Sequence, residues 1–128
     1  MRKLYYLLAF IAVLLLPKDI QAAALNVGDT FTAGDVTYKV TSISPNEVQV
    51  GNEQVAISRN YAGKLTIPSS VTGSDGNEYS VTTIGGWAFY SCENLSEVVI
   101  PETVRDIGSY SFNFSRITTL FMVLVDLV

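Results

Sequence analysis

The chain has 128 residues and a formal net charge of −4 at pH 7, with twelve acidic side chains, eight basic ones, one cysteine and no histidine. Its length allows one small domain, and its acidity argues against binding to nucleic-acid phosphates or anionic membrane surfaces. Without histidine the chain lacks the commonest general base and the commonest metal ligand. A single cysteine excludes an intramolecular disulfide.

Residues 1–24 have the three parts of an export signal. A positively charged start precedes an apolar run over residues 4–16, and three alanines over residues 22–24 offer a small-x-small cleavage pattern. The run is shorter than the about 20 apolar residues of a spanning helix. We therefore predict a signal peptide over residues 1–24 that is cleaved near Ala24, and an exported protein. An uncleaved membrane anchor is the alternative.

Residues 25–60 are predicted to form a β-rich N-terminal cap. Val36, Tyr38 and Val40 alternate with polar residues, which is the period of two that a half-buried strand shows. Residues 47–50 indicate a returning strand. The end of a repeat array needs a cover with a polar outer face, and so few strands would bury little core as an independent β-domain.

The centre of the chain repeats itself. The segment Ile84–Phe89 recurs at offset 23 as Ile107–Phe112, with isoleucine, glycine, an aromatic residue and phenylalanine at matching positions. Residues 95–100 follow the spacing Leu-x-x-Val-x-Ile, and Pro101, which lacks a backbone donor, ends that strand. A period of about 20–29 residues with this spacing indicates a leucine-rich repeat. We predict a mainly β fold, a short leucine-rich-repeat solenoid of period about 23.

The same frame begins earlier and defines the expected core. Residues 62–71 match the pattern of Leu95–Val104 at an offset of 33, and an insertion with Asp-Gly turn chemistry near residues 73–78 predicts a hairpin. Repeats are thus expected over residues 61–120. The predicted repeat core comprises Leu65, Ile67, Val71, Val81, Ile84, Phe89, Cys92, Leu95, Val98, Ile100, Val104, Ile107 and Phe112.

After Ile107 the pattern weakens. Ser111 and Ser115 replace the alanine and cysteine of the preceding repeat, and one residue is missing. Residues 121–128 form an apolar tail that is broken only by Asp126. The tail is interpreted either as a truncated repeat or as an apolar strand that pairs with a partner.

No enzyme, metal or cofactor site is predicted. The acidic pairs Glu93 with Glu97 and Glu102 with Asp106 would lie on the exposed edges of a solenoid, where nothing desolvates one carboxylate and raises its pKa. The acidic residues of the insert lack the ligand spacing of a calcium loop. Solvated charge is therefore the better interpretation of these side chains.

The repeat resembles the BspA-like leucine-rich repeat family, whose units follow I-G-x-x-A-F-x-x-C-x-x-L-x-x-V-x-I-P-x-x-V. Ile84–Val104 matches this pattern at nearly every position, including the Ala88-Phe89 pair and Cys92. The resemblance extends from Lys64 to about Leu120. It implies a secreted or surface-displayed bacterial protein that binds other proteins. The alternative is an incomplete fragment of a longer surface repeat protein without independent function.

The alternation of side chains also predicts a binding surface. If Leu95, Val98 and Ile100 point inward, Glu97 and Val99 point outward. In the neighbouring repeats the equivalent outward positions hold Thr66, Thr119 and Phe121. We expect these five residues to bind a protein or glycoprotein ligand, from a host extracellular matrix or from other cells. Nucleic acid, metal and cofactor are not expected, nor is a membrane span after signal cleavage.

Overall fold

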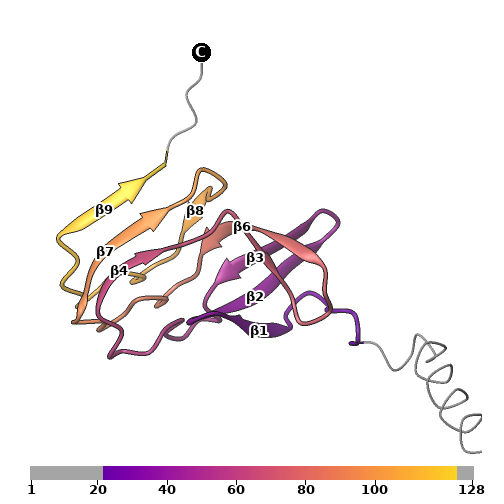
Figure 1. Cartoon of the computed structure of the whole chain (residues 1–128), viewed down its shortest axis with the longest axis horizontal. Coiled ribbons are helices and arrows are strands. Elements are labelled where there is room, and N and C mark those ends of the chain that lie inside the picture. The colour runs from indigo at the N-terminus through magenta and orange to yellow at the C-terminus, as the bar shows by residue number, and fades with distance from the viewer. Residues whose placement is uncertain (1–21, 124–128) are drawn as a thin grey trace, which may run out of the picture.

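The computed structural model describes residues 22–123 (Figure 1). Nearly all of the predicted signal peptide and the last five residues of the predicted tail lie outside this range. Every regular element within the range is a strand, and within it no helix is long and apolar enough to cross a membrane. The strands are β1 (Thr30–Ala33), β2 (Val36–Ile43), β3 (Asn46–Val50), β4 (Gly63–Thr66), β5 (Ser70–Thr72), β6 (Glu78–Ile84), β7 (Leu95–Ile100), β8 (Asp106–Ile107) and β9 (Thr119–Met122).

Two sheets face each other across the core. The larger has the order β1-β2-β3-β6-β5, with β8 also paired to β6, and the smaller has the order β4-β7-β9 (Figure 1). Strands β3, β6 and β8 are parallel to one another, as are β4, β7 and β9. The chain therefore winds through three coils, each crossing from the larger sheet to the smaller one. Coil 1 runs from β3 to β4, coil 2 from β6 to β7 and coil 3 from β8 to β9. This is the predicted mainly β solenoid.

The strand register shows two different spacings between coils. Ile84 pairs with Ile107, at offset 23, and Val98 pairs with Leu120, at offset 22. Val50, however, pairs with Ile84, at the larger offset of 34. The longer spacing accommodates the hairpin of β5 and β6, which pair antiparallel around residues 73–77. A single period of about 23 thus describes only coils 2 and 3.

Coil 1 begins earlier than the sequence pattern indicates. The amide of Gly85 donates to the carbonyl of Val50 at 2.8 Å, and the amide of Ala56 donates to the carbonyl of Ala88 at 2.8 Å. The segment predicted as cap, residues 25–60, therefore combines a cap made of β1 and β2 with the first half of coil 1. A fixed offset misses this half because the step from Gly51 to Ala56 is longer than the equivalent step from Gly85 to Ala88.

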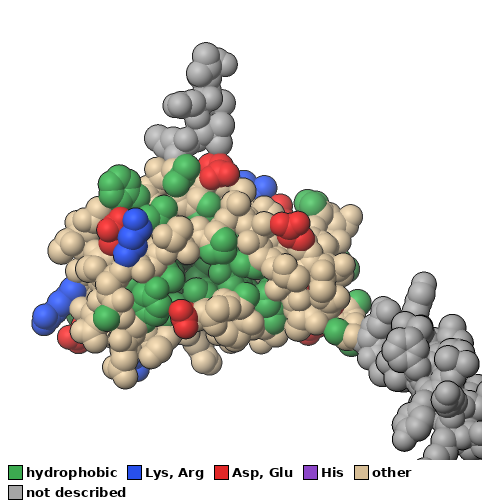
Figure 2. All heavy atoms as spheres, viewed as in Figure 1, with side chains coloured by type: hydrophobic (Ala, Val, Ile, Leu, Met, Phe, Trp, Pro, Cys, Tyr) green, Lys and Arg blue, Asp and Glu red, His purple; other side chains and the backbone are tan. Residues whose placement is uncertain are grey.

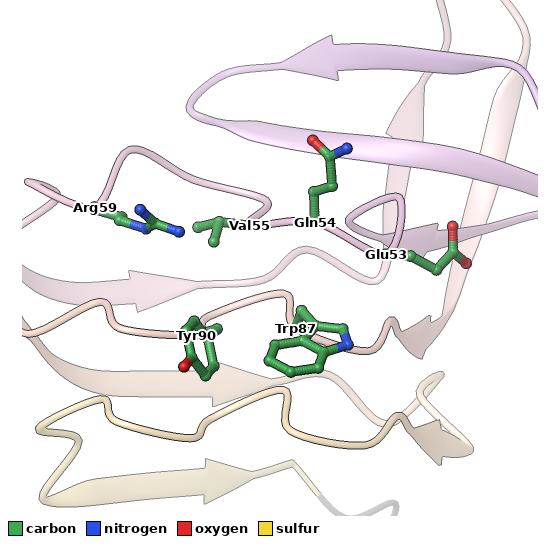
Figure 3. A pocket seen from close by; sticks show the side chains of 6 residues that line it. All are labelled: Glu53, Gln54, Val55, Arg59, Trp87 and Tyr90. Carbon is green, nitrogen blue, oxygen red and sulfur yellow. The ribbon is translucent and has the colours of Figure 1, made fainter.

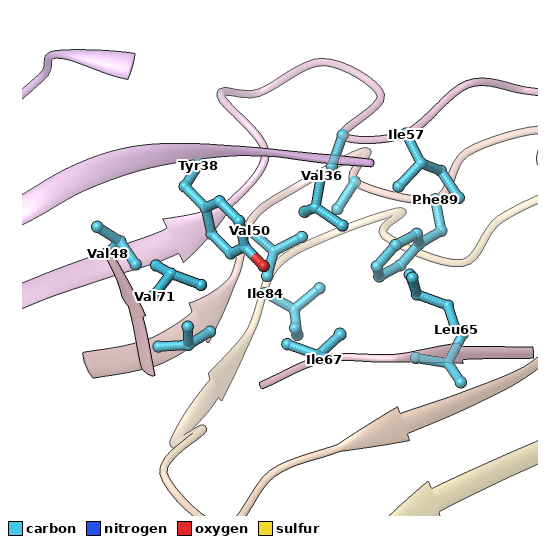
Figure 4. Close-up of a cluster of buried hydrophobic side chains, with 14 of the residues drawn as sticks. Val36, Tyr38, Val48, Val50, Ile57, Leu65, Ile67, Val71, Ile84 and Phe89 are labelled. Atoms are coloured by element: carbon cyan, nitrogen blue, oxygen red, sulfur yellow. The ribbon is translucent and has the colours of Figure 1, made fainter. Parts of the chain in front are cut away.

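The core fills the space between the two sheets (Figure 4). Ten of the predicted repeat-core side chains are buried; they are Leu65, Ile67, Val71, Val81, Ile84, Phe89, Cys92, Leu95, Val98 and Ile100. Side chains of the cap and of the start of coil 1 complete the core; among them are Phe31, Val36, Tyr38, Val40, Val48, Val50, Ala56 and Ile57. The core is thus shared by cap and repeats, which makes them one folding unit.

Coil 3 is less buried than predicted. Ile107 is 42% exposed, so its assignment to the core is wrong, and Val104 and Phe112 are only partly buried. Leu120 and Met122 occupy the inward positions of β9 but remain 46% and 49% exposed. The physical reason is that no coil within the described residues packs over the far side of β8 and β9.

The two unusual core positions keep their polar atoms satisfied. Ser111 replaces an alanine and is buried, but its hydroxyl donates to the carbonyl of Gly108 at 2.9 Å. A buried hydroxyl with a partner avoids the desolvation penalty of about 1–3 kcal/mol. Cys92 is fully buried, and burial raises the pKa of its thiol. The thiol is therefore held in its neutral form, as a small apolar side chain.

Asp75 connects the inserted hairpin to the segment before β1. Its carboxylate accepts hydrogen bonds from the amide of Leu25 at 3.1 Å, the hydroxyl of Tyr79 at 2.9 Å and both the amide and the side chain of Asn77. Partial burial opposes ionisation of Asp75, but the hydrogen bonds outweigh it and lower its pKa to about 2. The charged form is therefore the one that the fold stabilises.

Replacing Asp75 with asparagine should lower the free energy of unfolding by about 1 kcal/mol at pH 7, since hydrogen bonds to a charged acceptor are lost. The stabilisation by Asp75 is present above its unfolded pKa, about 3.9, and disappears as the pH falls towards 2. The difference between wild type and Asp75→Asn should thus shrink over that window in urea titrations. Asp35→Asn, on an exposed turn, is the matched control. Equal pH profiles for both variants would contradict the role of Asp75.

Candidate binding face

The candidate binding face is the outer side of the sheet β4-β7-β9. Strand register places Thr66 beside Val99 and Val99 beside Phe121, so these three residues form one row across the sheet. Neighbouring strands lie about 4.8 Å apart, which makes the row continuous. Glu97 and Thr119 lie beside each other in the next row. All five predicted ligand-binding residues are therefore brought together on one face.

A local irregularity in β7 sets which side chains face outward. Leu95 and Val98 are both fully buried, and two residues separate them instead of one. The register shifts at this point, between Gly63 and Lys64 of the neighbouring strand. Beyond the shift the normal alternation holds, with Val98 and Ile100 buried and Val99 half-buried. The spacing Leu-x-x-Val-x-Ile thus records a bulge followed by regular strand.

The polar row contains a residue that the sequence analysis missed. Lys64 lies beside Glu97, and its Nζ is 3.5 Å from Oε1 of Glu97. The sequence contains a signal for this pair, because Lys64 and Glu97 occupy equivalent repeat positions. Lys64 directly precedes Leu65, and Glu97 directly precedes Val98. Glu97 is consequently not a free carboxylate. An exposed pair of this kind contributes little to stability, at most about 1 kcal/mol.

The other row is the more apolar one. Phe121 is 56% exposed, Val99 is half-buried and Thr66 is exposed. Exposed aromatic side chains are common anchors of protein interfaces. A phenylalanine beside a valine, bordered by a Lys–Glu pair, has the composition of a small interface centre with a polar rim.

A cleft adjoins this face at β4. It measures about 380 Å³ and opens between the β1–β2 turn and β4, and Figure 2 shows hydrophobic side chains gathered in a hollow in the middle of the molecule. Its lining residues are Ala33, Gly34, Asp35, Val36, Tyr38, Tyr61, Leu65, Thr66, Pro68 and Val71. The hydroxyl of Tyr61 donates to the carbonyl of Lys64 at 3.1 Å and so covers part of the outer edge of β4.

A second surface, also missed, lies on the loops that connect the two sheets. We call it the aromatic patch, and it consists of Trp87, Tyr90, Tyr110 and Phe114. The ring of Trp87 lies 4.8 Å from the rings of both Tyr90 and Tyr110, and the rings of Tyr90 and Phe114 are 5.5 Å apart, measured between centroids. The recurrence of an aromatic residue at offset 23, Trp87 and then Tyr110, was the sequence signal for it.

A cleft of about 400 Å³ borders the aromatic patch (Figure 3). Its lining residues are Glu53, Gln54, Val55, Arg59, Trp87 and Tyr90. The loop of coil 1 forms one side and the loop of coil 2 forms the other (Figure 3). The cleft therefore exists only where the two coils stack.

Of the four acidic residues considered from the sequence, two pair with basic residues. Glu93 lies 3.9 Å from Arg116 across coils, and Glu97 pairs with Lys64. Glu102 and Asp106 are exposed. Within residues 22–123 no three His, Cys, Asp or Glu side chains gather in a way that could hold a metal ion.

Comparison with known proteins agrees with the architecture. Residues 63–123 match the family model described as BspA type leucine rich repeat region (6 copies). No curated protein matches the chain. Among solved structures, a leucine-rich repeat protein from Bacteroides ovatus is 34% identical with a TM-score of 0.58, over 70% of this chain and 22% of that one.

Two further solved structures share the fold. A leucine rich cell surface protein from Faecalibacterium prausnitzii is 26% identical with a TM-score of 0.60, over 77% of this chain and 24% of that one. The pneumococcal vaccine antigen PcpA is 23% identical with a TM-score of 0.65, over 77% of this chain and 27% of that one. This chain thus corresponds to about a quarter of the length of each of these proteins.

The segment matched by the family model begins at the first residue of β4 and ends one residue after β9. It therefore contains every strand of the sheet that carries the candidate binding face. The chain carries a BspA-type leucine-rich repeat region over residues 63–123.

Proposed function

We propose that this protein is an exported module that binds a protein or glycoprotein ligand on the outer face of the sheet β4-β7-β9, without catalysis. The observation that carries the proposal is the row Thr66–Val99–Phe121, which places an exposed aromatic side chain and a valine side by side on three paired strands. An exposed aromatic side chain of this kind contributes most to the binding free energy when the partner removes it fully from water.

Export is proposed from the leader over residues 1–24 and from the solved relatives. The relative from Faecalibacterium prausnitzii is described as a cell surface protein, and the pneumococcal relative as a vaccine antigen. Both descriptions fit a protein that acts outside the cytoplasm. A ligand from a host extracellular matrix or from another cell would meet this face there.

The absence of catalysis is proposed from the surroundings of the carboxylates. Glu97 pairs with Lys64, Glu93 with Arg116 and Glu47 with Arg105, the last at 2.9 Å. None of these three carboxylates lines either of the two clefts.

The double variant Val99→Asp with Phe121→Asp tests the face directly. The mature protein, residues 25–128, is presented to an array of immobilised extracellular-matrix proteins and glycoproteins, and captured protein is quantified by surface plasmon resonance. We expect the variant to bind at least tenfold more weakly, which corresponds to about 1.4 kcal/mol, because two charges replace the apolar row. Circular dichroism should remain that of the wild type, since Phe121 is exposed and Val99 half-buried.

The matched control is Val27→Asp with Ile43→Asp, which places the same charges on apolar residues that are 60% and 51% exposed outside the face. Its binding should equal that of the wild type. A folded Val99→Asp/Phe121→Asp variant that binds undiminished would move the site elsewhere. Capture by no immobilised protein would favour the alternative, a fragment of a longer surface repeat protein without independent function.

A further inference from the structure

The aromatic patch is not used by the proposed binding face and needs its own explanation. Trp87 is 41% exposed, Tyr110 58% and Phe114 66%. Exposed rings in contact with one another form a continuous apolar surface, which in a soluble protein marks an interaction site. The adjoining cleft of about 400 Å³ has the size of an ordinary ligand pocket.

The backbone beneath the patch is strained in a repeated way. Glu53, Trp87 and Tyr110 follow the glycine of their coils by two positions, and their φ angles are 65°, 65° and 58°. Positive φ is a genuine outlier for a bulky side chain and is the conformation that glycine adopts freely. The rings of Trp87 and Tyr110 are exposed, so burial of the ring does not offset the energetic cost of this backbone conformation. Because Glu53 shares this conformation, it belongs to the turn of each coil, and in coils 2 and 3 that turn carries the exposed rings of Trp87 and Tyr110.

The cleft combines a cation with hydrogen-bond donors, and its one carboxylate is already engaged. The carboxylate of Glu53 already accepts from Lys39 at 2.9 and 3.1 Å and from Gln49 at 3.2 Å. Arg59 is exposed and forms no ion pair with any residue in the described range. Its guanidinium carries five donors, and the indole of Trp87 is a donor only. The complementary ligand is rich in acceptors and carries a negative charge.

A proline-rich segment in the polyproline II conformation meets these conditions. Its carbonyl groups make no internal hydrogen bonds, and its prolines bring no N–H groups that would need acceptors. Such segments dock into grooves lined by aromatic side chains. An acidic residue within the segment would pair with a guanidinium by two parallel hydrogen bonds.

We propose that the cleft between the loops of coils 1 and 2 binds an acidic, proline-rich segment of a partner protein. Prolines pack on Trp87 and Tyr90, and an Asp or Glu of the ligand pairs with Arg59. Tyr110 and Phe114 extend the same surface along coil 3. This site is separate from the candidate binding face on β4, β7 and β9.

The test uses fluorescein-labelled peptides PPPDPPP and PPPNPPP in fluorescence polarisation titrations against the mature protein. We expect the aspartate peptide to bind and the asparagine peptide to bind at least tenfold more weakly, since only the former pairs with Arg59. Trp87→Asn should weaken binding of PPPDPPP at least tenfold. Asparagine tolerates positive φ, so this variant removes the ring while keeping the backbone conformation. Arg59→Gln should abolish the preference between the two peptides.

The control variant Val99→Asp/Phe121→Asp should bind PPPDPPP like the wild type, which separates this site from the proposed function. If the array experiment fails, the peptide result is unaffected. If the peptides fail to bind, the array result is unaffected. The inference is overturned if neither peptide binds at millimolar concentration, or if folded Trp87→Asn binds as well as the wild type. It is equally overturned if an oligosaccharide array binds at Trp87 while the peptides do not.

Discussion

Phe89→Ala is expected to destabilise the protein by about 3–5 kcal/mol. Phe89 is fully buried, and its ring stacks on Phe112 of the next coil with centroids 5.3 Å apart. Its amide donates to the carbonyl of Ser111 at 2.7 Å, so the backbone there is fixed and cannot move to fill the cavity. Small domains have a total stability of about 5–15 kcal/mol. Urea denaturation followed by circular dichroism should show a large fall in midpoint.

Phe114→Ala is the matched control for this change. Phe114 lies in the equivalent loop of coil 3 but is 66% exposed, so the same substitution should alter stability by no more than about 0.5 kcal/mol. Phe89→Leu should fall between the two, because it keeps most of the buried volume. If both alanine variants lost the same stability, the assignment of Phe89 to the centre of the core would be wrong.

Gly108→Ala is expected to loosen coil 3 from coil 2. A Cβ at this position would meet the backbone nitrogen of Gly86 and would lie 2.9 Å from the backbone carbon of Gly85 and from the Cα of Gly86. Backbone atoms cannot rotate away as a side chain does, so the two coils must separate locally. We expect a loss of about 1–3 kcal/mol, the cost of overpacking a filled site.

Hydrogen exchange would show which strands lose stability in this variant. Amides of β9, which pair with β7, should exchange faster in Gly108→Ala, while those of β2 and β3 should keep wild-type rates. Ser109→Ala is the control, because Ser109 follows Gly108 in the same loop but is exposed, so its exchange in β9 should match that of the wild type. A stable Gly108→Ala protein with unchanged exchange in β9 would show that the coils do not approach as closely as described.

Much of the solenoid could be predicted because its signals are local. The spacing of Leu95, Val98 and Ile100 is a property of one strand, a bulge followed by regular alternation, and the structure buries all three. The same alternation brings Val99 and Phe121 onto one face. The recurrence of Ile-Gly at offset 23 locates coils 2 and 3, because no insertion separates them.

Coil 1 shows where a pattern of fixed period is insufficient. Its register partner in coil 2 lies at the larger offset of 34, since the hairpin of β5 and β6 comes between them. Its loop is also longer than that of coil 2, so Ala56 matches Ala88 in space but not at a constant offset. Parallel strands pair through backbone N–H and C=O groups, which are the same at every residue, so the side-chain sequence does not directly reveal the register. Sequence comparison therefore finds the second half of coil 1, where Leu65 pairs with Val98, but misses the first half.

The sequence by itself determined that the chain is β-rich, that it repeats, and which side chains of β7 are buried, because these follow from the local pattern along a strand and from the recurrence of one motif. Only the tertiary structure decided which residues meet across coils. It placed Lys64 beside Glu97, Asp75 beside Leu25, and the rings of Trp87 and Tyr110 in contact. It also left Ile107 exposed. The physical reason is that burial and pairing depend on the neighbouring coil, and strand register sets which residues that coil presents.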